Sequence, residues 1–144
     1  MMFTIFQIGP WIIEADVTET KKQYEKAWPG LCECGNCRNF YEAINHLSAE
    51  ITALFKQFGI NPSLCNDLGE CGKENGLHHY IGSYPIVGRL PEGHPKFHVE
   101  RAGDVRFSFS LPHTKFFIPD GFPEPIIHLD FSLELPWVLA EKDE

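Results

Sequence analysis

The residues with the clearest chemical meaning are three cysteines in the run Cys-Glu-Cys-Gly-Asn-Cys, at Cys32, Cys34 and Cys37. Cys32 and Cys34 are two residues apart, so on an extended segment both thiols leave the same side of the chain. Gly35 and Asn36 tolerate positive φ and predict a tight turn that brings the third thiol back towards the second. Three convergent thiolates are soft ligands of the kind that zinc prefers. The spacing therefore predicts a cysteine knuckle able to hold zinc.

A closed structural zinc site needs a fourth ligand, and the remaining cysteines, Cys65 and Cys71, are the first candidates. They do not form a second C-x-x-C pair, and His78 or His79 follow shortly after them. Two other interpretations of the knuckle stay open. Its cysteines can serve as small core residues without a metal, or two of its thiols can form a redox pair. The candidate metal ligands are Cys32, Cys34, Cys37, Cys65 and Cys71, and the candidate cofactor is a structural zinc ion.

The other polar groupings match no catalytic motif. The seven histidines include no H-E-x-x-H pattern, and the adjacent His78 and His79 would point to opposite faces of a strand. His128, Asp130 and Ser132 share one face of a predicted strand. Same-face neighbours on a strand lie about 7 Å apart, too far for the nucleophile–base hydrogen bond of about 3 Å. We therefore interpret this face as solvated, and we assign no catalytic residue.

A helix after the knuckle is the element expected to position it. Apolar residues recur at spacings of three and four from Phe40 to Phe58, which predicts one long amphipathic helix over about residues 39–58. Asn39 is the predicted N-cap of this helix, and Gly59 supplies the left-handed residue after its end.

Alternating apolar and polar residues predict antiparallel strands in much of the rest of the chain. The most regular alternation covers residues 126–137, and the turn at Gly103 predicts a hairpin. Pro85 favours an edge position for the strand over residues 80–90. An antiparallel sheet with the helix packed on one face is the economical architecture. We predict a single α+β domain over residues 1–144.

Composition and charge limit the classes of partner. The formal net charge is −8 and no basic residues are concentrated, which argues against nucleic acid and against anionic membrane surfaces. No stretch approaches the roughly 18 apolar residues that span a bilayer. The apolar N-terminus lacks the basic region of a secretion signal, so we expect a cytoplasmic protein with reduced cysteines. The expected partner is another protein or a small molecule.

The run from Cys32 to Phe40 opens the predicted helix, and an apolar strand ending in Pro136-Trp137 follows later in the chain. This layout resembles small uncharacterised bacterial proteins that share a C-x-C-x-x-C-x-N-[FY] signature. The resemblance implies a bacterial, cytosolic protein and brings no activity with it. The signature positions in this chain are Cys32, Cys34, Cys37, Asn39 and Phe40.

Taken together, these patterns predict a non-enzymatic binding or interaction protein with a structural, zinc-stabilised knuckle. The rival hypotheses are an enzyme that uses zinc or a thiolate, and a thiol redox sensor. The number of ligands separates them, because four protein ligands close a zinc site and three leave a position for chemistry.

Overall fold

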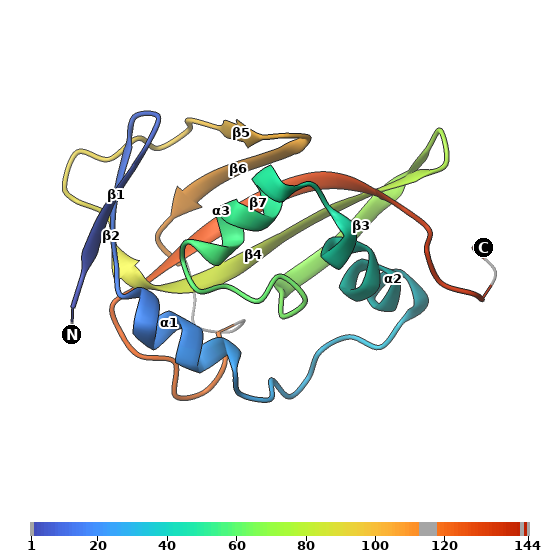
Figure 1. The fold of residues 1–144 in the computed structure, drawn as a ribbon, viewed down its shortest axis with the longest axis horizontal. Helices are drawn as coiled ribbons and strands as arrows, with labels where there is room; N and C mark the ends of the chain where they lie inside the picture. Colours follow the sequence, from blue (N-terminus) through green and yellow to red (C-terminus); the bar gives the residue numbers. More distant parts are fainter. Residues whose placement is uncertain (1, 113–117, 142, 144) are drawn as a thin grey trace.

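The protein folds into an antiparallel sheet of seven strands with three short α-helices (Figure 1). The computed structural model describes residues 2–112, 118–141 and 143. The strands are β1 (Thr4–Ile8), β2 (Trp11–Ala15), β3 (Asn66–Glu74), β4 (Leu77–Arg89), β5 (Glu100–Ala102), β6 (Val105–Ser110) and β7 (Ile126–Pro136). The helices are α1 (Val17–Tyr24), α2 (Gly35–Ala43) and α3 (Ala49–Lys56), with a 3₁₀ turn, η1 (Ile44–His46), between the last two. The strand order is β1-β2-β4-β7-β6-β5, and β3 also pairs with β4. The α+β class is therefore as predicted.

β4 and β7 form the centre of the sheet. They pair from Leu77 opposite Pro136 to Val87 opposite Ile126, which covers the whole length of β7. The strict alternation predicted for β7 is confirmed, and its inward-facing residues form a buried stripe on one face. The buried residues of this stripe are Ile127, Leu129, Phe131, Leu133 and Leu135.

Pro85 predicted that its strand lies at an edge of the sheet. This prediction is wrong, because β4 lies between β2 and β7 inside the sheet. The other edge of β4 pairs with β3 as far as Ser83 and with β2 from Gly88 onward. Pro85 falls between these two partners, where no neighbouring strand needs a backbone N–H from it. Its carbonyl accepts a hydrogen bond of 2.8 Å from the Tyr24 hydroxyl of α1. A local gap filled by a helix therefore accommodates this proline.

The single long helix predicted over residues 39–58 is wrong, because the segment forms α2, η1 and α3. Leu47 and Ser48 both adopt extended backbone, and Ser48 occupies the N-cap position of α3. The apolar spacing continues across this break because both helices bury their apolar residues in the same core. Gly59 ends α3 with a φ of +82°, as predicted. Its N–H donates to Lys56 and the next N–H donates to Phe55, which is the Schellman pattern.

Aromatic side chains join the helices to the sheet. The Phe131 ring of β7 lies 5.7 Å from that of Phe40 in α2 and 5.1 Å from that of Tyr84 in β4. Gly82 leaves room for this packing, since a Cβ there would come within 2.9 Å of the Phe131 ring. None of the helices in the described residues is long and apolar enough to cross a membrane.

Candidate metal centre

The three cysteines of the predicted knuckle converge in the structure. The sulfur atoms of Cys32, Cys34 and Cys37 all lie within 4.8 Å of one another, and all three are free thiols. Among the described residues this is the one group of three or more Cys, His, Asp or Glu side chains arranged closely enough to hold a metal ion. Cys32 and Cys34 are exposed, whereas Cys37 is buried. The triad could therefore hold a metal ion that stays accessible from solvent on one side.

The start of α2 brings the thiols together. Cys34 is the N-cap residue, and its sulfur accepts the Cys37 backbone N–H at 3.4 Å. The backbone N–H of Cys34 in turn lies 3.5 Å from the sulfur of Cys32. The predicted left-handed turn is wrong, because Gly35 and Asn36 belong to the first turn of α2. A helical turn rather than a positive-φ turn therefore returns the chain to the third cysteine.

The two thiols of the C-x-x-C pair differ in acidity. The hydrogen bond from the Cys37 N–H lowers the pKa of the Cys34 thiol, because it stabilises the thiolate at the helix N-terminus. Burial raises the pKa of the Cys37 thiol, and hydrogen bonding with the other two cysteines raises it further. The structure thus places an accessible, acidic thiol beside a buried, protonated one.

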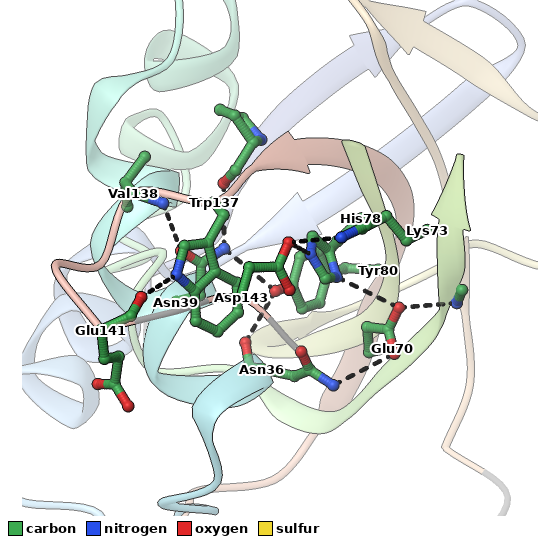
Figure 2. A network of polar contacts seen from close by, with 12 residues as sticks. Asn36, Asn39, Glu70, Lys73, His78, Tyr80, Trp137, Val138, Glu141 and Asp143 are labelled. Carbon is green, nitrogen blue, oxygen red and sulfur yellow. Dashed lines mark hydrogen bonds and ion pairs between the residues drawn. The ribbon is translucent and has the colours of Figure 1, made fainter. Parts of the chain in front are cut away.

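Asn39 anchors the knuckle helix to the sheet (Figure 2). It is fully buried, so the predicted N-cap role is wrong: α2 begins four residues earlier and turns this side chain towards β7. Its amide nitrogen donates to the Pro136 carbonyl at 3.0 Å and lies 3.3 Å from the Tyr80 hydroxyl. Its amide oxygen accepts the Val138 N–H at 2.7 Å. The Tyr80 hydroxyl donates to the Asn36 carbonyl at 2.8 Å, which extends this support into the knuckle itself.

A second chain of polar contacts reaches the knuckle from β3 and β4 (Figure 2). The Asn36 amide donates to the Glu70 carboxylate at 3.3 Å. The buried His78 ring has its Nδ1 at 3.5 Å from Glu70 and its Nε2 at 2.9 Å from Asp143. Hydrogen bonds from His78 and then Lys73 lower the pKa of Asp143. This network ties the turn after Cys34 to two strands and to the segment that follows β7.

Neither of the other two cysteines joins the triad. Cys65 is a buried core residue whose thiol lies 3.3 Å from the Asn66 carbonyl and 3.6 Å from the Ser83 carbonyl. Burial raises its pKa, so it stays a neutral thiol. Cys71 is exposed on β3 and lies outside the group of converging sulfurs. His78 also lies outside this group, which leaves the knuckle with three converging thiols among the described residues.

Two concave surfaces border the triad. One is a cleft of about 430 Å³ whose wall includes Trp28, Cys32 and Asn66, with Cys65 also contributing to the lining. The other is an open depression of about 740 Å³ that shares Trp28 and Cys32 and adds Arg38. Cys32 therefore contributes to the lining of both hollows.

Comparison with protein-family models, with curated proteins and with solved structures returned no match. The bacterial origin and cytosolic location implied by the signature stay predictions. Sequence reasoning missed the supporting roles of Asn39, Tyr80 and His78. No pattern indicated the role of Asn39, because this residue precedes the apolar stripe that begins at Phe40 and was predicted to be an exposed N-cap.

Proposed function

We propose that this protein is a binding protein that holds one zinc ion through Cys32, Cys34 and Cys37. The observation that carries the proposal is the approach of the three sulfurs within 4.8 Å, without a disulfide. The Cys37 backbone N–H directed at the Cys34 sulfur stabilises negative charge on that sulfur. Zinc binds thiolates at about 2.3 Å, so three sulfurs at this separation suit one tetrahedral ion.

The number of thiols supports a role in binding rather than a purely structural one. With three protein ligands, a tetrahedral zinc keeps one coordination position for an outside group. Cys32 borders both hollows, so a donor atom from a small molecule or a partner protein has access to that position. The hydrogen bonds of Asn39 and Tyr80 hold the start of α2, which carries the thiols, in place before an ion binds.

Zinc titration against a competing chromophoric chelator tests this proposal. We expect one ion per chain and an affinity that falls about tenfold or more when any of the three cysteines is replaced by serine. Cys71→Ser is the matched control, because Cys71 is an exposed cysteine outside the triad. An equal loss of affinity in Cys71→Ser would mean that Cys71 is a fourth protein ligand and that the site is closed. Zinc-free protein whose Tm does not respond to chelator would overturn the proposal.

A thiol redox pair is the second candidate function, and the opposite pKa shifts of Cys34 and Cys37 favour it. An acidic, exposed thiol next to a buried one is the arrangement of an attacking and a resolving cysteine. Equilibration in glutathione buffers followed by mass spectrometry of the 27–38 peptide tests it. A disulfide between these two residues at a defined potential would support the redox role, and a peptide that stays reduced throughout would exclude it.

A further inference from the structure

The sheet face turned away from the core carries a row of polar side chains across four strands. In register, Ser132 of β7 lies opposite Arg106 of β6, and Arg106 lies opposite Arg101 of β5. On the other side of Ser132, its hydroxyl lies 2.6 Å from Nε2 of His79 in β4. These four side chains line a cavity of about 310 Å³, at the small end of the range for ligand pockets. From this arrangement we propose a binding site for the oxyanion group of a small molecule.

Within the described part of the chain, neither of the two arginines forms an ion pair with a carboxylate. Arg101 and Arg106 are a directly opposed cross-strand pair, and like charges in that position destabilise a sheet. Other arginines in the described residues form ion pairs, as Arg38 does with Glu141 and Arg89 with Glu14. No described carboxylate lies within the 4.0 Å of an ion pair to Arg101 or Arg106, although Asp104 and Glu134 also line the cavity. An oxyanion bound between the two guanidinium groups relieves this repulsion.

The serine–histidine pair adds a neutral donor to the same cavity. Two other hydroxyls on this face, those of Ser83 and Ser110, are already engaged, because both donate to the Asp130 carboxylate. Ser132 differs because its partner is a histidine nitrogen. When that nitrogen carries the ring proton, it donates to Ser132, and the serine hydroxyl is then free to donate into the cavity.

The donor set selects an oxyanion rather than a halide or a neutral ligand. Each guanidinium presents a planar fork that matches the two oxygens of a carboxylate or of a phosphate. Asp104 and Glu134 also line the cavity, so recognition depends on short-range contacts with the two guanidinium groups and not on the overall field. The ligand is therefore a small molecule that places one carboxylate or phosphoryl group against Arg101 and Arg106. This site is separate from the thiols and does not depend on the metal proposal.

Titration by NMR in chloride buffer, with inorganic phosphate in one arm and acetate in the other, tests the site. We expect saturable shifts of the backbone amides around residues 79, 101, 106 and 132. The anion with the lower Kd identifies the natural group as phosphoryl or carboxylate. Arg106→Gln and, separately, Arg101→Gln should each weaken that binding about tenfold or more, because each removes a charged hydrogen-bond donor.

Lys56→Gln is the matched control, since it removes the same charge from an exposed position on α3. It should leave the affinity unchanged. Both arginines are exposed, so their variants are expected to keep the amide spectrum of a folded chain. The absence of saturable binding for both anions would overturn the proposal. So would equal affinities in wild type, Arg106→Gln and Lys56→Gln.

Discussion

The knuckle and the polar row on the sheet gather their side chains in opposite ways. The thiols are neighbours in the chain, and a few buried hydrogen bonds from Asn39 and Tyr80 hold the helix start that arranges them. The polar row draws on strands far apart in the chain, and strand register alone sets Ser132 opposite Arg106. A single substitution can therefore disturb the arrangement of the thiols, because few contacts support it. The alignment of the polar row changes only if the register of the strands changes. Four predictions test that difference.

The largest expected effect comes from the core that both regions share. Phe131→Ala removes a buried ring that packs between Phe40 and Tyr84, so we expect a loss of about 3–5 kcal/mol in the free energy of unfolding. Urea melts measure it. Phe97→Ala is the control, because that ring is 95% exposed and its loss should cost under about 0.5 kcal/mol. Similar losses in the two variants would show that Phe131 is not packed as described.

Replacing the anchor of the knuckle should have the next largest effect and should spare the polar row. Asn39→Ala leaves the Pro136 carbonyl and the Val138 N–H without their side-chain partner, at a cost of about 2–3 kcal/mol. Asn45→Ala, an exposed asparagine in η1, provides the comparison and should cost less than about 1 kcal/mol. Thermal melts together with zinc affinity measure both variants. An unchanged zinc affinity in Asn39→Ala would mean that the thiols hold their arrangement without this anchor.

A smaller loss is expected on the polar face. Ser132→Ala removes one hydrogen bond to His79, and we expect about 0.5–1.5 kcal/mol. Ser108→Ala is the control, because Ser108 is a serine of β6 on the same face of the sheet. Its replacement should lower the free energy of unfolding by less. Denaturant melts of the pair separate the two. Equal losses in the two variants would mean that the hydrogen bond of Ser132 adds no stability, and that this face is a solvated surface as the sequence predicts.

The smallest effect on stability, but a clear chemical one, concerns the thiols. Because the pKa of Cys34 is lowered and that of Cys37 is raised, more Cys34 than Cys37 is thiolate at any neutral pH. Iodoacetamide should therefore modify Cys34 first in metal-free protein, and its rate should level off at a lower pH than that of Cys37. Tandem mass spectrometry of the 27–38 peptide measures the order. Faster modification of Cys37 would reverse the assignment of the acidic thiol.

Sequence patterns correctly predicted the features that depend on residues close together in the chain. The alternation in β7, the hairpin at Gly103 and the helix end at Gly59 follow from spacing and backbone preference, and the structure confirms them. The convergence of Cys32, Cys34 and Cys37 followed from spacing too, although a helical turn produces it.

The remainder depends on contacts between distant residues, which spacing does not report. Apolar periodicity shows which face of a segment is buried, so it continued across the extended backbone at Ser48 without revealing the break. α1 was missed because its residues are mostly polar and it fills the gap beside Pro85. The pairing of His79 with Ser132 depends on which strands are neighbours, and only the assembled sheet sets that order.

The anchoring of Asn39 also determines when the knuckle can form during synthesis. Its partners Pro136 and Val138 lie 97 and 99 residues further along the chain. A nascent chain that has just exposed the three cysteines therefore carries them on a helix start without its support. The frame closes only after β7 has emerged and paired with β4. If the knuckle binds zinc as proposed, tight binding of the ion is then a late event for each newly made chain, coupled to completion of the sheet rather than to synthesis of the cysteines.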